Sequence, residues 1–176
     1  AHLHMRDDQG AGIMDPVKFY ETIKLIRAHK DCDVIVNCTS SGDNRVSDDS
    51  PYGNAMRMLH HKNVPGIEMG TFDASSFNWG IPGGVFHNSP TMLMQLGTLY
   101  QEKGIKPEYE CFEMGHIDTI LDMARKGEIP GDPMQFNFVL GVKGCTPATV
   151  QNLVWMVNAI PAGSTWTSTG VGRAAF

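Results

Sequence analysis

Two histidines separated by one residue stand near the start of the chain, His2 and His4. In a β-strand, residues i and i+2 point to the same face with their Cα atoms about 6.5–7 Å apart. Two imidazoles at that spacing can bind one divalent ion with metal–nitrogen distances of about 2.0–2.1 Å. A turn-like segment follows, so both histidines lie near the carboxyl end of the strand, where parallel barrels place their sites. The spacing therefore predicts a metal site; the alternative is two ordinary histidines that face a solvated cavity.

Three glutamates crowd residues 106–113, a segment predicted to be a strand: Glu108, Glu110 and Glu113. Glu108 and Glu110 share one face because side chains alternate along a strand. A carboxylate inside a barrel is costly unless it binds a cation, accepts hydrogen bonds or takes up a proton. Glu110 is therefore a candidate catalytic residue, with a structural ion pair as the alternative. His116, shortly after this strand, is more typical of a helix cap than of a metal ligand.

Hydroxyl side chains follow another predicted strand, in the turn TSSG at residues 39–42. Hydroxyls and free backbone N–H groups at such a turn can hold a carboxylate or a phosphate, although a solvated turn has the same composition. Thr71 lies on a further strand, and alternation places it on the face opposite to that of Glu68. Gly172 and Arg173 close the last predicted strand, where a small residue and an arginine could bind the phosphate of a cofactor.

The elements that must position these residues alternate along the chain. Apolar and β-branched runs predict six strands, over residues 2–7, 33–39, 66–72, 106–113, 136–142 and 165–172. Capping residues and apolar positions at helical spacing predict five helices, over 15–29, through Met56 and Leu59, and over 89–104, 116–127 and 146–158. This alternation predicts a parallel α/β fold with right-handed crossovers.

Two architectures fit this pattern. The repeat length favours a (β/α)8 TIM-barrel type, present as an incomplete barrel, because a full one needs about 250 residues. An open doubly wound sheet is the alternative, but no GxGxxG motif follows the first strand. In either case residues 1–176 are expected to form a single α/β domain. The long loop after residue 72 is of the kind that builds sites, and its candidates for substrate specificity are Phe72, Phe77, Asn78 and Trp79.

Composition narrows the class of protein. The chain has 176 residues, a formal net charge of −5 at pH 7 and 41% hydrophobic residues, which is typical of one globular domain with a buried core. No apolar run approaches the roughly 18–20 residues of a membrane span, and no basic block indicates nucleic-acid binding. Its 4 cysteines are widely separated and form no CxxC pair, which predicts buried, reduced thiols in a cytoplasmic protein.

Several motifs occur in a fixed order: AHLHMRD, TSSG, EMGTFDASSFNWG, GIKPEYECFEMGHI, FVLGVKG and TWTSTGVGR. In that order the chain resembles the β-keto acid cleavage enzymes, of the 3-keto-5-aminohexanoate cleavage type, over essentially its whole length. The resemblance implies a zinc-dependent (β/α)8 barrel that forms a homo-oligomer. It also implies a retro-Claisen acyl transfer, in which a small β-keto acid and acetyl-CoA give acetoacetate and a new acyl-CoA.

Carried onto this sequence, the resemblance implies that His2 and His4 are zinc ligands and that Glu110 is the inner acidic residue of the site. The positions that it assigns to substrate binding are Ser40, Ser41, Gly42, Thr71 and Glu108. Two parts of the family pattern have no counterpart here. One is the first strand with its acidic residue, and the other is the last strand, whose RxGLED-type motif supplies a third zinc ligand, an arginine and an aspartate.

We therefore expect a fragment that matches barrel strands two to seven and is inactive when isolated. Two other classes of function stay open on the sequence. A metal-dependent hydrolase barrel also uses an HxH strand, but it needs further His and Asp ligands at later strand ends. A degenerate barrel could bind an acyl-CoA without catalysing a reaction.

Overall fold

The central feature of the computed structural model, which describes residues 1–79 and 84–172, is one parallel sheet. Its strands, in spatial order, are β1 (His2–Leu3), β4 (Asn37–Cys38), β5 (Met69–Asp73), β8 (Lys106–Cys111), β9 (Gln135–Leu140) and β10 (Thr165–Gly170). Each strand lies beside the next one along the chain, which is the strand order of a (β/α)8 barrel. A doubly wound sheet reverses its order at a switch point, so that alternative does not describe this sheet.

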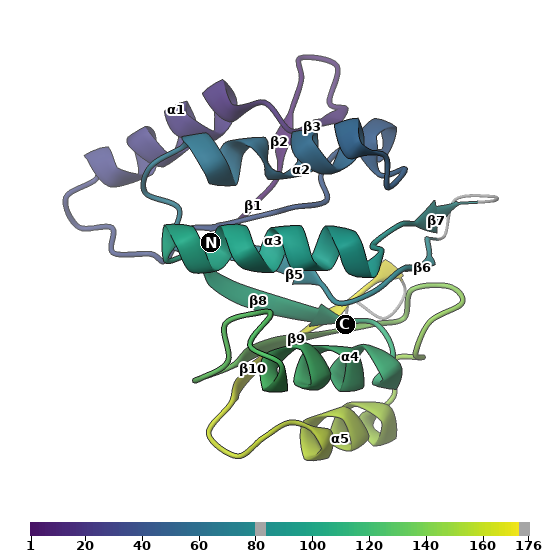
Figure 1. The fold of residues 1–176 in the computed structure, drawn as a ribbon. Helices are drawn as coiled ribbons and strands as arrows, with labels where there is room; N and C mark the ends of the chain where they lie inside the picture. The colour runs from purple at the N-terminus through teal and green to yellow at the C-terminus, as the bar shows by residue number, and fades with distance from the viewer. Residues whose placement is uncertain (80–83, 173–176) are drawn as a thin grey trace.

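Helices connect consecutive strands of this sheet. They are α1 (Pro16–Ala28), α2 (Pro51–Asn63), α3 (Pro90–Lys103), α4 (Met114–Arg125) and α5 (Val150–Ala159). Figure 1 shows them following one another in chain order along the sheet, from α1 and α2 to α5. The fold is therefore a curved half-barrel of TIM type. None of the described helices combines the length and the hydropathy that a membrane span requires.

The helix starts follow the capping residues of the sequence with two exceptions, α5 and α4; α4 begins at Met114, before the predicted residue 116, and its N-cap Glu113 makes no side-chain capping bond. Asp15 accepts a hydrogen bond from the backbone of Val17, and Ser89 accepts one from Met92, so α1 and α3 begin as predicted. The prediction that Thr146 and Pro147 open the last helix is wrong. That helix begins three residues later, because the Thr149 side chain accepts from the backbone N–H of Asn152.

The sheet is strongly curved. Two strands separate β1 from β8, so a flat sheet would hold them about 14 Å apart. Nevertheless His2 Nδ1 on β1 lies 3.5 Å from Glu108 Oε2 on β8. Only a sheet that bends around its inner face can bring these two side chains together, and this bend is the curvature of a barrel.

The first two predicted strands are shorter than expected. The chain leaves the sheet after Leu3, and β2 (Met5–Arg6) pairs antiparallel with β3 (Gly12–Ile13) in a separate hairpin. Asp7 fixes the turn between them, since its carboxylate accepts the N–H groups of Gln9 and Ala11. A second hairpin joins β6 (Phe77–Asn78) to β7 (Val85–Phe86) beyond the carboxyl end of β5.

Helix α2 buries a different face from the one that its apolar residues suggest. Met56 and Leu59 are only half-buried, whereas Arg57, His60 and His61 are buried. Polar side chains lie inside a protein when they find hydrogen-bond partners there. The polar face of this helix therefore has partners in the sheet, which are described below.

Gly97 of α3 packs against the segment that leads to β9. A Cβ atom at this position would meet the carbonyl oxygen of Glu128 at 2.6 Å and Ile129 Cγ2 at 2.7 Å. We expect Gly97→Ala to lower the free energy of unfolding by about 1–3 kcal/mol, as overpacking does. Gly115→Ala in α4 is the matched control, because its added carbon meets nothing within 4 Å and alanine favours a helix by up to about 1 kcal/mol. Urea unfolding of the purified protein measures both changes, and equal effects would contradict this packing.

Candidate functional site

A cavity of about 340 Å³ opens at the carboxyl ends of the parallel strands. Every strand of the sheet contributes to its wall through its own residues or the one directly after it, except β4, which contributes through Ser41 three residues beyond its end. The polar lining consists of His2, His4, Ser41, Asp73, Glu110, Asn137 and Thr169. This is the end at which TIM barrels hold their sites. The placement therefore makes the cavity the candidate site of the molecule.

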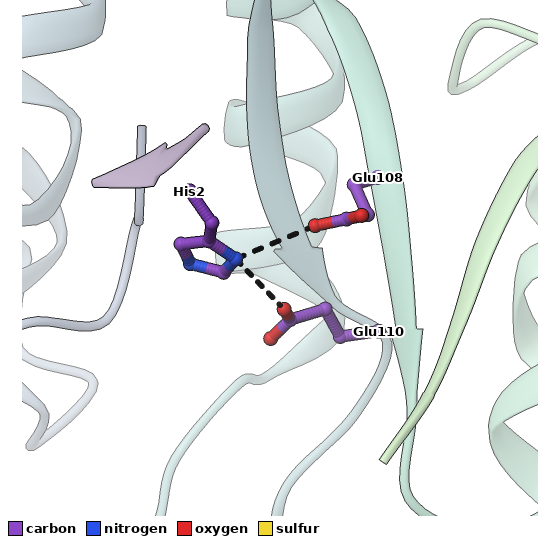
Figure 2. Close-up of side chains that lie close together, drawn as sticks. All are labelled: His2, Glu108 and Glu110. Carbon is purple, nitrogen blue, oxygen red and sulfur yellow. Dashed lines mark ion pairs between the residues drawn. The ribbon is translucent and has the colours of Figure 1, made fainter. Parts of the chain in front are cut away.

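An imidazole faces two carboxylates beside this cavity. His2 Nδ1 lies 3.5 Å from Glu108 Oε2 and 3.8 Å from Glu110 Oε1, and Figure 2 shows the ring directed at both side chains. The possible ligand atoms all lie within 4.8 Å of one another. Nitrogen and carboxylate oxygen atoms are ligands that zinc accepts. The residues present therefore fit a divalent cation at this point.

His4 reaches the same cavity but does not converge with His2. The two rings are stacked, with centroids 5.0 Å apart and planes 12° from parallel. The nitrogen lone pairs of stacked rings lie in separate, nearly parallel planes, so the pair as it stands does not aim at one point. Burial and the neighbouring His2 lower the pKa of His4, which favours the neutral form that binds metals. That both imidazoles bind one ion stays a prediction.

Glu110 is a buried carboxyl group among other acidic groups. Burial raises its pKa well above the usual range, and the neighbouring carboxylates of Asp73 and Glu108 raise it further. Asn137 Nδ2 donates to its Oε1 at 3.3 Å, while Asn37 Nδ2 donates to Glu108 Oε2 at 2.7 Å. Glu110 therefore favours its protonated form unless a cation lies beside it. This is the electrostatic setting of a catalytic acid or base.

Neighbouring residues of the TSSG turn at 39–42 have different roles. Ser41 lines the cavity, but Ser40 and Thr71 are fully buried behind it. The Ser40 N–H donates to Thr71 Oγ1 at 2.8 Å, and the two hydroxyls lie 3.3 Å apart. Ser40 and Thr71 therefore hold the turn, and Ser41 is the hydroxyl that a ligand can reach. Gly42, next in the turn, does not line the cavity.

Other predicted positions lie away from the cavity or outside the described residues. Gly172 follows β10 with a left-handed φ of 65° and does not line the cavity. Arg173 lies outside the residues that the structure describes, so its predicted role in cofactor binding stays a prediction. His116 accepts the backbone N–H of Phe112 at 3.2 Å, which is a local capping role of the kind expected.

The sequence reasoning missed Asp73 and most of the apolar wall. Asp73 is 3% exposed at the end of β5, and its Oδ2 has no hydrogen-bond partner within the described chain. Its signal was available, because alternation places it on the same face as Thr71. Phe77 and Trp79 line the cavity as candidates for specificity, joined by Phe86, Phe112, Val139 and Val171.

Two of the residues suggested for specificity lie elsewhere. Phe72 points to the helices and packs against Tyr100 and Tyr109. Asn78 does not line the cavity and instead contacts Gly144 in the loop after β9. The alternation of side chains along β5 explains the direction of Phe72, because its neighbours Thr71 and Asp73 face the inside of the barrel.

A parallel half-barrel with imidazole, carboxyl and hydroxyl groups at its carboxyl ends defines an enzyme-like site of TIM-barrel type. The chain belongs to the β-keto acid cleavage enzyme family, whose profile matches residues 1–176. This confirms the family that the ordered motifs predict.

Curated relatives of this family cover nearly the whole chain. The 3-keto-5-aminohexanoate cleavage enzyme of Fusobacterium nucleatum is 37% identical over 175 residues, which make up 99% of this chain and 60% of the relative. The 3-dehydrocarnitine:acetyl-CoA trimethylamine transferase of Rhizobium meliloti is 26% identical over 99% of this chain and 62% of the relative. The 3-oxoadipate:acetyl-CoA acetyltransferase of Cupriavidus necator is 27% identical over 98% of this chain and 57% of the relative. The chain thus spans 57–62% of these relatives.

Solved structures show the same fold. The apo structure of ObcA superposes with a TM-score of 0.65 at 20% identity, over 80% of this chain and 32% of ObcA. The ternary complex of ObcA with a C4-CoA adduct and oxalate superposes with a TM-score of 0.65 at 19% identity, over 80% of this chain and 33% of ObcA. At these identities the likeness supports the architecture of the half-barrel.

The raised pKa of Glu110 makes the stability of the metal-free protein depend on pH. A carboxyl group whose folded pKa exceeds its unfolded pKa stabilises the fold below the unfolded pKa, and this stability is lost as pH rises through the folded pKa. Glu110→Gln removes the ionisable group and with it this loss of stability at high pH. We therefore expect the variant to raise the free energy of unfolding at pH 8 by about 1–3 kcal/mol, with little gain at pH 4. Denaturant unfolding with chelator at both pH values measures this. The exposed Glu102→Gln is the control, and a pH-independent effect of Glu110→Gln would contradict the assignment.

Proposed function

We propose that the whole protein is a zinc-dependent β-keto acid cleavage enzyme that uses acetyl-CoA as co-substrate. A small β-keto acid and acetyl-CoA would give acetoacetate and the corresponding acyl-CoA. The observation that carries the proposal is the imidazole of His2 facing the buried carboxyl groups of Glu108 and Glu110 at the mouth of the half-barrel. Family membership supports the reaction class, and two of the relatives are named as acetyl-CoA-dependent transferases.

In this proposal His2 and His4 hold the zinc ion beside the two glutamates. Zinc bound there would supply a Lewis acid that polarises the β-keto group and stabilises an enolate. Glu110 is the proton-transfer group, because burial and the neighbouring carboxyl groups raise its pKa well above the usual range of a glutamate. Glu108 is a candidate contact for the substrate beside it.

The remaining lining residues orient the substrate and exclude water. The Ser41 hydroxyl would donate to the substrate carboxylate, which fixes the keto group relative to the imidazoles. The aromatic wall of Phe77, Phe86 and Phe112 is apolar and closely packed, with the rings of Phe77 and Phe112 stacked at 3.8 Å. A wall of this kind strengthens polar interactions in the cavity because it keeps water out.

We propose that groups of the family pattern outside residues 1–176 complete the site. The relatives are longer, and in the family pattern a strand beyond those described here supplies a third zinc ligand and an arginine. We therefore propose that residues 1–176 make up a single barrel domain without the first and last strands of the family, and we expect them to be inactive in isolation. The described cysteines are all free, which suits a cytoplasmic enzyme, and the family pattern suits a homo-oligomer.

The geometry favours this function over a metal-dependent hydrolase. Such barrels place further histidine or aspartate ligands at later strand ends. Among the described strands after β1, only β5 ends in such a residue, Asp73, and none ends in histidine; His116 uses its Nδ1 to accept a backbone N–H. A pure acyl-CoA binder would not need an imidazole facing two buried carboxyl groups.

The activity can be tested directly on the full-length protein. We expect it to form acetoacetate from acetyl-CoA and a β-keto acid, to lose this activity with a chelator and to regain it with zinc. His2→Gln is expected to lower kcat/KM by about 100-fold or more, since it removes a ligand. His29→Gln, at the exposed end of α1, is the matched control. Coupled assay of acetoacetate measures both variants, and activity that needs neither acetyl-CoA nor metal would contradict the proposal.

The two serines of the turn should behave differently. Ser41→Ala removes the hydroxyl in the cavity, so we expect KM for the β-keto acid to rise by about tenfold with a smaller change in kcat. Ser40→Ala removes a buried hydrogen bond with Thr71 and is expected to cost about 1 kcal/mol of stability while KM changes little. Steady-state kinetics and thermal unfolding of both variants measure this. The reverse pattern would show that Ser40 is the binding hydroxyl.

A further inference from the structure

Helix α2 holds the turn after β4 through three consecutive carbonyl groups. Each of these oxygens accepts a hydrogen bond from a different side chain of the helix. The bonds are His61 Nε2 to Cys38 O at 3.1 Å, His60 Nε2 to Thr39 O at 2.8 Å and Arg57 Nε to Ser40 O at 2.8 Å. The next residue of the chain is Ser41, which lines the cavity. The polar face of α2 therefore sets the backbone that presents this hydroxyl.

The two histidines contribute no charge to this face. Burial lowers the pKa of His61 to about 4 and that of His60 well below its usual range. Each ring bonds through Nε2, and the Nδ1 atoms have no partner within the described residues. Arg57 differs because a guanidinium group stays protonated in proteins. It therefore brings a positive charge to the turn.

The charge of Arg57 is not neutralised by an ion pair. The residue is 0% exposed, and its remaining bonds go to neutral oxygens, from Nη1 to His87 O at 2.9 Å and from Nη2 to Asn88 Oδ1 at 2.7 Å. Its guanidinium also lies over the Phe86 ring, 4.7 Å from the centroid. Asp73 and Asp49 act on it only through space, and neither forms an ion pair with it among the described residues. Buried charges are usually paired, whereas this guanidinium has no anionic hydrogen-bond partner among the described residues.

A short chain of hydrogen bonds connects the guanidinium to the cavity. Arg57 binds the carbonyl of the peptide unit that joins Ser40 to Ser41. The N–H of that unit donates to Thr39 Oγ1 at 3.1 Å, and Thr39 Oγ1 lies 3.1 Å from Ser41 Oγ. Hydrogen bonds in series polarise one another, and a low dielectric strengthens this effect. Through this series of hydrogen bonds the positive charge polarises the hydroxyl that faces the cavity.

We propose that Arg57 is a positioning residue that makes the Ser41 turn selective for the carboxylate of the substrate. The inference rests on the proposed function, in which this turn receives the carboxylate of a β-keto acid. Arg57 does not touch the substrate. It acts through the Ser40–Ser41 peptide, and the bound carboxylate supplies the negative charge that the buried guanidinium lacks.

The test compares an anionic ligand with a neutral ligand of the same shape. Acetoacetate and acetoacetamide are titrated into the zinc-loaded full-length protein, and the two dissociation constants are measured by calorimetry. We expect Arg57→Gln to weaken acetoacetate binding by about 10- to 100-fold, which is the range for a hydrogen bond to a charged group. Binding of acetoacetamide should change by less than about threefold by the same reasoning. Arg57→Lys keeps the charge and should keep most of the preference for acetoacetate.

Two controls separate charge from structure. His60→Gln keeps a neutral donor on the neighbouring carbonyl, so it should change both affinities by the same factor. Arg45→Gln removes an exposed arginine that is already paired with Asp43, and should change neither. The ratio of the two affinities does not depend on the folded fraction of a sample. If the Gln variant does not fold, loss of the preference for acetoacetate in the Lys variant still overturns the role of the charge.

The outcomes distinguish this inference from the proposed function. Equal losses for both ligands in Arg57→Gln, or loss of the preference in Arg57→Lys, would overturn the role of the charge without contradicting the proposed function. If the wild-type protein binds neither ligand and forms no acetoacetate, the proposed function is wrong and the inference fails with it. A selective loss of acetoacetate binding in the Gln variant, retained in the Lys variant, supports the role of Arg57.

Discussion

The contact between one imidazole and two carboxyl groups across the inner face of the sheet constrains the rest of this molecule. His2 and the pair Glu108 and Glu110 lie on strands separated by two others, so they meet only because the sheet is curved. Their meeting also places acidic groups where water is scarce, which costs free energy unless protons or cations compensate. Asn37 and Asn137 partly compensate by donating hydrogen bonds. The curvature of the fold and the chemistry of the site are thus two aspects of one arrangement.

Much of the fold could be predicted because its signals are local. Proline after Asp15 and after Ser89 marks helix starts that depend on only a few neighbouring residues. The same local logic failed at Thr146, whose hydroxyl instead donates to Glu113 at 3.1 Å, a contact distant in sequence. The predicted lengths of the first two strands were wrong for a similar reason. A run such as residues 2–7 is extended throughout, but its pairing partner changes after Leu3 from β4 to β3.

The site was predictable where alternation in a strand applies and not where a helix supplies the polar groups. The inward direction of His2, Glu110 and Thr71 follows from the period of two. Arg57, His60 and His61 look like the solvated face of an amphipathic helix, because their partners are backbone carbonyl groups that carry no sequence signal. Their burial depends on how α2 packs against the end of β4, and the sequence of the helix does not show this tertiary packing.

The outer strand β10 has a consequence for how this chain behaves in solution. Five of its six residues are exposed, and β9 is its only partner in the described sheet. The segment TWTSTG carries no charge and no proline, the two devices that usually prevent strand addition at an open edge. Such an edge offers backbone N–H and C=O groups to a strand of a second chain, so we expect pairing between isolated copies of residues 1–176 to increase with their concentration. Light scattering would then increase while the helical circular dichroism signal is still intact.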